Sequence, residues 1–339
     1  MVVSILLILF GCFEMKKKVL MILLTTVLTF GYTTLPAMAE SQEAENTESA
    51  DAEAESDPSL EEGYTEENDG CTSVVAWAKN GENDIYGKFY YPADYEEGKT
   101  YPVVIMSHGA SVTHEFYEKA QWTNYVNGLG YICYAYDFCG GSDQSKSSMT
   151  TEEMSCLTEK SDLNAVLDFV ESQSFCNQQQ IFLMGQSFGG FVTGITAPER
   201  QDEIAGVMFL YPALSVVDVL HEQYPTKEDL PTGEEESENF GTKVGAQYYT
   251  DMYDIDVMGT LGQYEGDVLI IHGVNDQTIP YTYSVQAIEE AYQNSSSELV
   301  LIGGKQSVHA FEVFNEEGRA EAQEAVGDYL SRHKTAVEE

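Results

Sequence analysis

The chain has 339 residues, of which 16 are basic and 57 acidic, so its formal net charge at neutral pH is −41. A charge of this sign and size repels nucleic acids and anionic membranes, which excludes both as partners. The length, together with a hydrophobic content of 43 %, is sufficient for a domain with a substantial core.

Residues 1–39 contain the three parts of a secretory signal. A basic start at residues 15–18 precedes an apolar run at residues 19–28, and residues 37–39 (Ala-Met-Ala) form a small-residue cleavage site. We therefore expect Met15 to be the true start and residues 1–39 to be a signal peptide. The mature protein, with a charge near −43, is expected to be secreted or displayed at the cell surface, while an uncleaved signal would anchor it in a membrane.

Residues 40–69 form an acidic segment with 13 acidic residues and no lysine or arginine. Such a composition has too little apolar surface to support a core, so we expect a disordered linker. Two roles fit this linker, a spacer from a cell surface and a solubilising tail. One globular domain is expected to follow, over residues 70–335.

Strand and helix patterns alternate along this expected domain. Short, mostly apolar runs predict strands at residues 73–78, 85–91, 102–106, 131–138, 181–184, 204–211, 267–271 and 298–302. Amphipathic stretches predict helices at residues 117–127, 151–172, 283–292 and 317–331. Alternation of this kind predicts an α/β fold, with a mostly parallel central sheet and helices on both faces.

The alternation stops after the sixth expected strand. Residues 212–266 have no buried-strand pattern and carry an acidic middle, marked by glycine and proline, at residues 226–241. A stretch of this length inside a compact domain is usually a lid or an insertion. We therefore expect a cap insertion at this point.

Five cysteines would remain after cleavage of the signal, and they are Cys71, Cys133, Cys139, Cys156 and Cys176. Their number is odd and their spacing contains no C-x-x-C, which indicates neither a disulfide framework nor a zinc site. One bridge, such as Cys139–Cys156, and a set of buried free thiols are both compatible with this pattern.

The sequence around Ser187 has the order strand, tight turn, helix. Apolar residues 181–184 lead into Gly-Gln-Ser-Phe-Gly at residues 185–189, and a helical pattern begins at Phe191. In this context Gly-x-Ser-x-Gly forms a nucleophile elbow, with the serine on a strained turn at a helix N-terminus. Side chains at the two glycine positions would collide with the neighbouring strand and helix. Ser187 is therefore the expected nucleophile.

A serine hydroxyl needs a base to accept its proton and a carboxylate to orient that base. Behind a nucleophile elbow, the acid and then the base follow on loops after later strands. Asp276 lies five residues past the strand at residues 267–271, and His309 lies seven residues past the last expected strand. Three suitable residues in the right order at strand ends predict a catalytic triad of Ser187, Asp276 and His309.

Attack on a carbonyl group creates an oxyanion that needs N–H donors. The expected donors are the backbone N–H groups of Phe188, directly after the nucleophile, and of Ala110, in the loop after residues 102–106. In the same loop, His114 is expected to face solvent, whereas His272 is expected to be a packed structural residue. The sequence has no phosphate-binding glycine loop and no clustered metal ligands, so no cofactor or metal is expected.

These motifs resemble those of the α/β-hydrolases, in particular the bacterial cinnamoyl and feruloyl esterases. The resemblance spans residues 101–330 and rests, besides the insertion, on His108-Gly109-Ala110, Asp137-Phe138 with Gly-Gly-Ser-Asp, residues 185–190, His272-Gly273 with Asp276, and His309-Ala310-Phe311. It implies a cap over the acyl pocket whose polar groups contact a phenolic ring, with Asp218, Tyr248 and Tyr249 at comparable positions. The family commonly has His before the nucleophile and Gln after it, where this chain has Gln186 and Phe188.

The sequence thus predicts an exported serine carboxylesterase that forms an acyl-enzyme on Ser187. Its substrates would be small acyl or hydroxycinnamoyl-type esters, either free or linked to a polysaccharide. A serine peptidase or amidase with the same triad is an alternative, although peptidases of this fold usually carry a further large domain. A non-catalytic surface binding protein on a hydrolase scaffold is an alternative of a different class.

Overall fold

The computed structural model describes residues 57–68, 71–233, 235–236 and 241–333. The expected signal peptide, and the expected linker as far as residue 56, lie outside these ranges. The fold belongs to the compact unit Ser59–Glu339. Within the described ranges, every helix is too short or too polar to cross a lipid bilayer.

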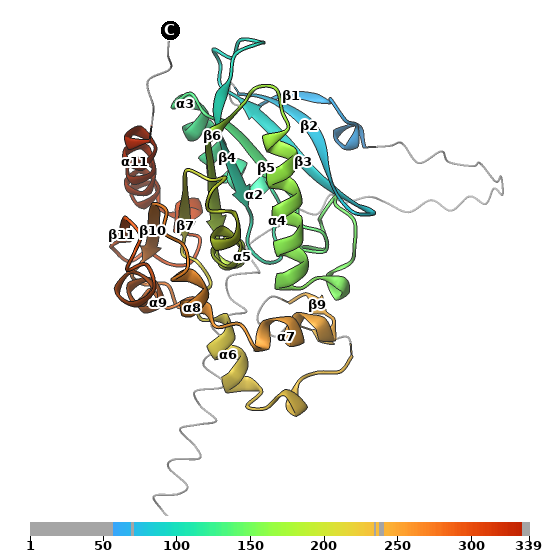
Figure 1. Cartoon of the computed structure of the whole chain (residues 1–339), viewed down its shortest axis with the longest axis vertical. Coiled ribbons are helices and arrows are strands. Elements are labelled where there is room, and N and C mark those ends of the chain that lie inside the picture. Colours follow the sequence, from blue (N-terminus) through green and yellow to red (C-terminus); the bar gives the residue numbers. More distant parts are fainter. Residues whose placement is uncertain (1–56, 69–70, 234, 237–240, 334–339) are drawn as a thin grey trace, which may run out of the picture. The chain divides into compact units, whose positions relative to one another are not determined.

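A nine-stranded sheet forms the centre of the fold (Figure 1). Its strands are β1 (Thr65–Asn68), β2 (Cys71–Asn80), β3 (Asn83–Tyr91), β4 (Tyr101–Ser107), β5 (Ile132–Tyr136), β6 (Cys176–Gln186), β7 (Gly206–Leu210), β10 (Val268–Gly273) and β11 (Ser297–Ile302). Their spatial order is β1-β2-β3-β5-β4-β6-β7-β10-β11. The pairs from β1 to β5 are antiparallel, and all pairs from β5 to β11 are parallel. The expected mostly parallel sheet is confirmed.

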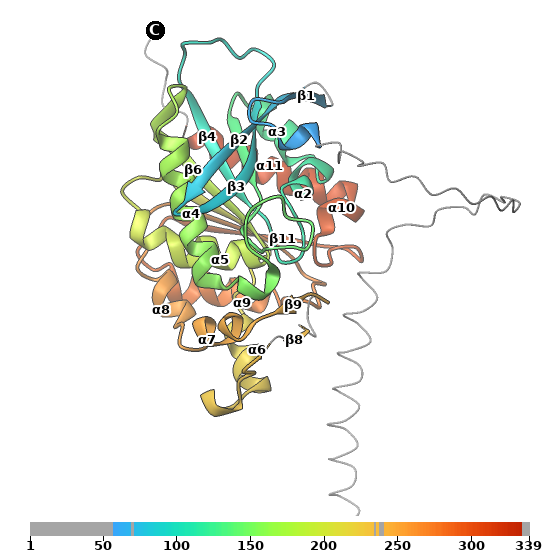
Figure 2. The same cartoon turned by 90° about the vertical axis from the view of Figure 1, so that its right-hand side faces the viewer.

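Helices cover both faces of this sheet (Figure 2). One face packs on α4 (Cys156–Glu171) and α5 (Phe188–Thr196), and the other on α2 (Glu115–Lys119), α3 (Trp122–Gly128), α10 (Phe311–Phe314) and α11 (Glu316–Arg332). Successive residues of β4 enter opposite cores, Val103 and Ile105 on the α4 side and Val104 and Met106 on the α3 side. Because side chains of a strand alternate between faces, a continuous apolar run is the pattern expected of such a doubly covered strand.

The segment after β7 contains the expected insertion. Its elements are α6 (Val216–Gln223), a 3₁₀ turn (Lys227–Asp229), β8 (Glu235–Glu236), β9 (Lys243–Val244), α7 (Ala246–Tyr253) and α8 (Val257–Leu261). Ser155 Oγ, at the start of α4, lies 2.6 Å from Asp251 Oδ2 of α7. A Cβ atom on Gly245 would lie 2.2 Å from the carbonyl oxygen of Glu152, so only glycine allows this close approach. The α7 half of the insertion is therefore firmly attached to the N-terminal end of α4.

Two expectations about local structure were wrong, and the structure decides one question that the sequence left open. The expected linker extends to residue 69, but β1 pairs with β2 in antiparallel register; its acidic sequence gave no apolar signal because an edge strand is held by backbone hydrogen bonds. The expected helix at residues 151–172 is interrupted, since Ser155 accepts a hydrogen bond from the Thr158 N–H and thereby caps a new helix, α4. Of the two alternatives left open for the cysteines, the structure shows buried free thiols, because Cys139 and Cys156 are both free and buried, as are Cys133 and Cys176.

Two further elements complete the C-terminal half. The expected helix at residues 283–292 consists of α9 (Thr282–Gln286) followed by a π-helical turn (Ala287–Ala291).

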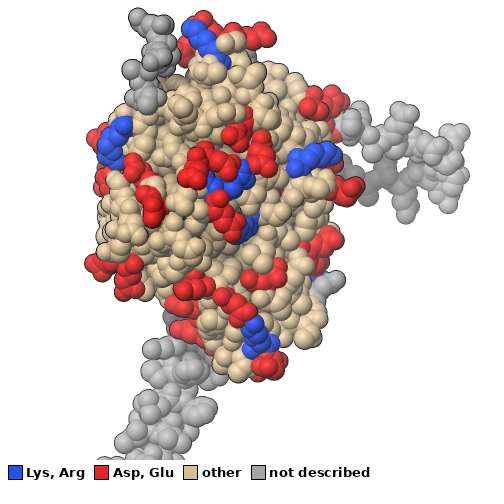
Figure 3. All heavy atoms as spheres, viewed as in Figure 1, with Lys and Arg blue, Asp and Glu red and all other residues tan. Residues whose placement is uncertain are grey.

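On the face of the molecule shown in Figure 3, acidic side chains are widely spread and the fewer basic ones lie among them. Among the described residues, several basic side chains pair with acids, as Lys160 Nζ does with Glu199 Oε1 at 2.6 Å. The negative charge predicted from composition is thus distributed over this surface.

Candidate active site

Ser187 occupies the turn between β6 and α5 with φ +51° and ψ −118°. Non-glycine residues seldom adopt such a conformation, which costs about 1–3 kcal/mol. The backbone holds it in place, since Ser187 N–H donates to the Leu210 carbonyl (3.0 Å) and the Ala213 N–H donates to the Ser187 carbonyl (2.9 Å). A Cβ on Gly189 would lie 2.2 Å from the carbonyl oxygen of His108. The turn therefore has the strained geometry and the close glycine contact that the sequence predicts for an elbow.

The structure brings the three expected triad residues together from separate loops. His309 Nε2 lies 3.0 Å from Ser187 Oγ, and His309 Nδ1 lies 2.7 Å from Asp276 Oδ2. The loops that carry them follow β6, β10 and β11, whose C-terminal ends lie at one edge of the parallel sheet. The Asp276 side chain is fully buried, while 17 % of the His309 side chain remains exposed. This arrangement allows a proton to move from Ser187 to an imidazole that a carboxylate holds in place.

The surroundings of Asp276 favour its ionised form. Burial by itself would raise the pKa of this carboxyl, but hydrogen bonds from His272 and His309 hold the pKa well below its usual range. Its other oxygen, Oδ1, accepts the backbone N–H groups of Thr278 (2.8 Å) and Ile279 (2.9 Å). A carboxylate at this position requires the proton of neutral His309 to reside on Nδ1, which leaves Nε2 free to accept the serine proton.

His272 supports this carboxylate from behind. The residue is fully buried, its Nε2 lies 3.0 Å from the Ile279 carbonyl oxygen, and its Nδ1 lies 2.8 Å from Ser284 Oγ. Since a carbonyl oxygen only accepts, Nε2 carries the hydrogen, and this N–H is 3.3 Å from Asp276 Oδ2. The expectation that His272 is a packed structural residue is confirmed.

The loop after β4 approaches the nucleophile closely. A Cβ on Gly109 would lie 3.0 Å from Ser187 Cβ, and the Gly109 N–H already donates to Gln186 Oε1 at 2.6 Å. The next residue, Ala110, is half-buried. Phe188 is the first residue of α5, where a backbone N–H has no intrahelical acceptor. The Ala110 and Phe188 N–H groups therefore stay the predicted oxyanion donors.

His108 shapes this loop from inside the protein. Its Nδ1 donates to the Gly109 carbonyl (2.7 Å), and its Nε2 accepts the Phe138 N–H (3.0 Å). Burial lowers the pKa of His108, which favours the neutral ring that this bonding pattern requires. The loop is thus tied to the segment that follows β5.

The expectation that His114 faces solvent was wrong, because only 1 % of the residue is exposed. Its Nδ1 and its backbone N–H lie 2.6 Å and 2.8 Å from Asp137 Oδ1. Asp137 is fully buried at the end of β5; burial alone would raise its pKa, but the His114 hydrogen bond contributes to a lowered pKa. The sequence does place Asp137 directly after a buried strand, yet nothing in it identifies His114 as the partner.

The three residues suggested as substrate contacts lie in different surroundings. Tyr248 of α7 is buried and stacks on Phe188, with ring centroids 5.9 Å apart and planes at 26°. Tyr249 packs edge-on against Tyr248 at 5.2 Å. Asp218 of α6 is exposed and accepts a hydrogen bond from Tyr283 of α9 at 2.7 Å. Of the three, Tyr248 is the one in direct contact with the elbow, and substrate contact stays a prediction for each.

Sequence reasoning missed two residues that adjoin the triad. The ring of Tyr211 packs edge-on against His309, with centroids 4.7 Å apart, and its hydroxyl donates to Glu312 Oε1. Both residues are fully buried. A tyrosine after a strand and a glutamate at a helix start look ordinary in sequence, so neither carried a signal of its own.

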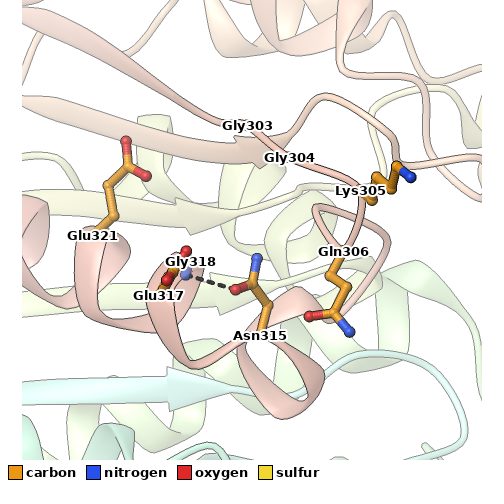
Figure 4. Close-up of a pocket in the computed structure, with 8 residues that line it drawn as sticks. All are labelled: Gly303, Gly304, Lys305, Gln306, Asn315, Glu317, Gly318 and Glu321. Atoms are coloured by element: carbon orange, nitrogen blue, oxygen red, sulfur yellow. Dashed lines mark hydrogen bonds between the residues drawn. The ribbon is translucent and has the colours of Figure 1, made fainter.

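A shallow surface pocket lies between the loop after β11 and the start of α11 (Figure 4). Its lining residues are Gly303, Gly304, Lys305, Gln306, Asn315, Glu317, Gly318 and Glu321. Asn315 caps α11, because its Oδ1 accepts the Gly318 N–H at 3.0 Å, so this oxygen already has a partner within the protein. In the described part of the chain, no three or more His, Cys, Asp or Glu side chains are grouped so that they could hold a metal ion.

Comparisons with known proteins bear on the family and the fold of the chain. A sequence profile of the prolyl oligopeptidase family, Peptidase_S9, matches residues 116–334. Est1E from Butyrivibrio proteoclasticus, solved with ferulic acid bound, has a TM-score of 0.65 at 22 % identity, over 76 % of this chain and 98 % of its own. The α/β hydrolase GrgF from Penicillium sp. sh18 has a TM-score of 0.58 at 18 % identity, over 78 % of this chain and 98 % of its own.

A third similar structure is the α/β hydrolase domain-containing protein 10 from mouse. Its TM-score is 0.59 at 16 % identity, over 77 % of this chain and 100 % of its own. At these identities the three structures establish the fold, which is that of the α/β-hydrolases.

Proposed function

Since the chain belongs to the prolyl oligopeptidase family and has the α/β-hydrolase fold, it is a serine hydrolase, and we propose that it is a carboxylesterase. The observation that carries this proposal is the hydrogen-bonded series from Ser187 through His309 to Asp276. The proposed substrates are small acyl or hydroxycinnamoyl-type esters, either as small molecules or attached to a polysaccharide.

The proposed reaction has two halves. As Ser187 Oγ adds to the ester carbonyl carbon, His309 Nε2 accepts its proton, and the Ala110 and Phe188 N–H groups donate to the oxyanion. His309 then returns this proton to the leaving alcohol, which leaves an acyl group on Ser187. Water repeats the sequence in the second half, with its proton passing through His309 to the departing serine oxygen. Asp276 stays ionised throughout and stabilises the imidazolium ion.

Two features support an aromatic acyl group. Tyr248 of the insertion stacks on Phe188, the residue that adds the second oxyanion donor. Its neighbours Tyr249 and Tyr224 extend the aromatic contacts within the insertion, with ring centroids 5.6 Å apart. A relative of the same fold, Est1E, was solved with ferulic acid bound. We infer that the insertion acts as a cap over the acyl group.

A second candidate is a peptidase or amidase, which the match to the prolyl oligopeptidase family favours. The same triad serves ester and amide cleavage, so the two activities differ in how the site protonates and releases the leaving group. Hydrolysis of p-nitrophenyl acetate without hydrolysis of peptide p-nitroanilides supports the esterase. The reverse preference identifies a peptidase.

We also propose that the protein is exported, on the basis of the signal-like residues 15–39. The acidic segment that follows would then separate the catalytic domain from the signal region. N-terminal sequencing of the protein recovered from the culture medium or the cell surface tests this, and a start near Glu40 is the expected result. A start at Met15 in the membrane fraction would show that the signal is retained as an anchor.

The main experiment compares the wild-type protein with Ser187→Ala on p-nitrophenyl acetate, butyrate and octanoate and on methyl ferulate. Removal of the nucleophile should lower kcat on the order of 10⁶-fold. Ser73→Ala is a matched control, because Ser73 is a buried serine of β2 whose hydroxyl bonds the Glu66 carbonyl. A folded wild-type protein that cleaves no ester and no anilide contradicts the proposal and favours a non-catalytic binding protein.

A further inference from the structure

A series of hydrogen bonds runs behind the triad, from the loop after β4 to the helix after His309. The Gly109 N–H donates to Gln186 Oε1 at 2.6 Å. The Gln186 side chain lies close enough to the Tyr211 hydroxyl to act as a donor to it, which opposes the rise that burial causes in the pKa of Tyr211. That hydroxyl donates to Glu312 Oε1, which also receives the Trp122 Nε1–H at 3.4 Å. Residues from five separate parts of the chain are thereby brought together.

The donors and acceptors of this series have one consistent direction. Because Gln186 Oε1 faces a backbone N–H, its amide nitrogen must be the atom that reaches Tyr211. The Tyr211 oxygen accepts from this amide and donates its own hydrogen to Glu312. The Gln186 amide therefore fixes the orientation of the Tyr211 hydroxyl, and this hydroxyl in turn is directed at Glu312.

Tyr211 also contacts the general base directly. Its ring lies edge-on to His309 at 4.7 Å and to Phe311 at 5.8 Å. The residue follows β7 with φ +39°, a backbone conformation that is unusual for a side chain of this size. Its N–H donates to the Ile271 carbonyl at 2.7 Å, which holds the strained residue in position. Tyr211 therefore contacts the general base His309 through its ring, and its hydroxyl lies next to Gln186, the residue before the nucleophile.

Glu312 ends the series in a dry environment. The residue is fully buried, and its second oxygen, Oε2, has no hydrogen-bond partner among the described residues. Burial raises the pKa of Glu312, while the proximity of His309 acts in the opposite direction. Burial of a carboxyl with an unpaired oxygen costs free energy of folding, so its presence calls for a role in the fold or the reaction.

We propose that three residues act as positioning residues for the site, namely Gln186, Tyr211 and Glu312. Together they keep the Gly109–Ala110 backbone and the His309 ring correctly placed relative to Ser187. Gln186 sets the oxyanion loop, Tyr211 connects it to the base, and Glu312 fixes the Tyr211 hydroxyl. The inference rests on the proposed esterase function, because it concerns how that site is aligned for the transition state.

The central test is Tyr211→Phe, which removes the hydroxyl and keeps the ring against His309. Without this bond the Gln186 amide is free to turn, and the Gly109–Ala110 backbone loses its fixed position. Loss of one oxyanion donor costs about 10²–10³-fold in kcat elsewhere, so a displaced donor should cost about 10- to 100-fold. KM for p-nitrophenyl acetate should change less than about threefold, since the lost contact is specific to the transition state.

Tyr329→Phe provides a matched control. Tyr329 is equally buried, and its hydroxyl donates to the Asp267 carbonyl at 2.8 Å, just before the start of β10 and away from the triad. Both variants remove one buried tyrosine hydroxyl that donates a hydrogen bond, so both should lower the melting temperature. The control should keep wild-type kcat. Equal kcat in the two variants would overturn the positioning role, because the hydroxyl of Tyr211 would then be only structural.

Two variants of Glu312 distinguish the effect of its hydrogen bonds from the effect of its side-chain volume. Glu312→Gln keeps an acceptor for Tyr211 and Trp122 and should retain kcat within about threefold, whereas Glu312→Leu should lose as much as Tyr211→Phe. The double variant Tyr211→Phe/Glu312→Leu should lose no more than either single one, because both break the same link. A loss in Glu312→Gln as large as that in Glu312→Leu would overturn the assigned role of Glu312.

Labelling of Ser187 by a fluorophosphonate keeps the two proposals distinguishable. A folded wild-type protein that is neither active nor labelled overturns the proposed function, and the network's role with it. An active wild-type protein and an equally active Tyr211→Phe overturn the network alone. Slower labelling of Tyr211→Phe, with Tyr329→Phe at the wild-type rate, is the expected result.

Discussion

Asp276→Asn tests the assigned geometry most directly, because the two oxygens of Asp276 have different partners. Oδ1 accepts the Thr278 and Ile279 N–H groups, and Oδ2 accepts from His309 Nδ1. An asparagine must place its carbonyl oxygen toward the two backbone donors, since an amide NH₂ cannot accept them. Its NH₂ group then faces the two histidines.

The size of the expected loss in kcat follows from the His309 tautomer that this NH₂ group imposes. His309 Nδ1 can accept from the amide only if it carries no hydrogen, so the hydrogen moves to Nε2, which faces Ser187 Oγ at 3.0 Å. An imidazole protonated at Nε2 cannot accept the serine proton. In a Ser-His-Asp triad this change costs about 10⁴-fold in kcat, which corresponds to about 5.5 kcal/mol of transition-state stabilisation.

The assay is steady-state hydrolysis of a p-nitrophenyl ester across a pH range, with kcat and KM determined separately. Asp267→Asn is a matched control, because Asp267 also pairs with a histidine, His333, at 2.6 Å, but lies just before the start of β10 and away from the triad. It should change kcat less than about threefold, as surface substitutions away from the site do. An Asp276→Asn protein within about tenfold of wild type would refute the assigned proton path.

Three further substitutions have defined outcomes. Gly109→Ala would place a Cβ 3.0 Å from Ser187 Cβ, so kcat for p-nitrophenyl acetate should fall about 10- to 100-fold. Tyr248→Ala should lower kcat/KM for methyl ferulate more than for p-nitrophenyl acetate, because it removes the ring stacked at the elbow; an unchanged ratio would contradict an aromatic acyl pocket. Burial raises the pKa of Asp162 to about 6. Since this exceeds the unfolded value near 3.9, the stability it contributes is complete below about pH 4 and is lost as pH rises through about 6, by at most about 3 kcal/mol. Urea unfolding at several pH values should show this loss in wild type relative to Asp162→Asn, and parallel curves would exclude it.

The sheet and the triad were predictable because each depends on local sequence. A buried strand such as residues 102–106 is apolar at every position, since its two faces pack on different helices. Ser187 sits in a five-residue motif, and Asp276 and His309 follow strands in a fixed order. Their convergence needed no knowledge of side-chain packing, because parallel strands bring their C-terminal ends to one edge.

The misses arose where a partner comes from far along the chain. His114 looked like a surface residue because its hydrogen-bond partner, Asp137, lies 23 positions later. The edge strand β1 has no apolar side chain, since it is held by backbone pairing with β2 and by polar contacts such as that from Ser73 Oγ to the Glu66 carbonyl. A sequence pattern reports the chemistry of a residue and its near neighbours, whereas these contacts depend on which elements the fold places together.

The residues behind the triad connect these two observations. Gln186 was visible in the sequence as a departure from the resembled family, which commonly has His at that position. The structure supplies a physical reason for glutamine here, because its amide oxygen accepts the Gly109 N–H while its amide nitrogen can serve as a donor to the neighbouring Tyr211 hydroxyl. A neutral histidine also has one acceptor and one donor, but its ring nitrogens are arranged differently from the glutamine amide, so it would not meet both partners in this geometry. Gln186, Tyr211 and Glu312 should therefore change together, and Gln186→His alone should impair kcat as Tyr211→Phe does.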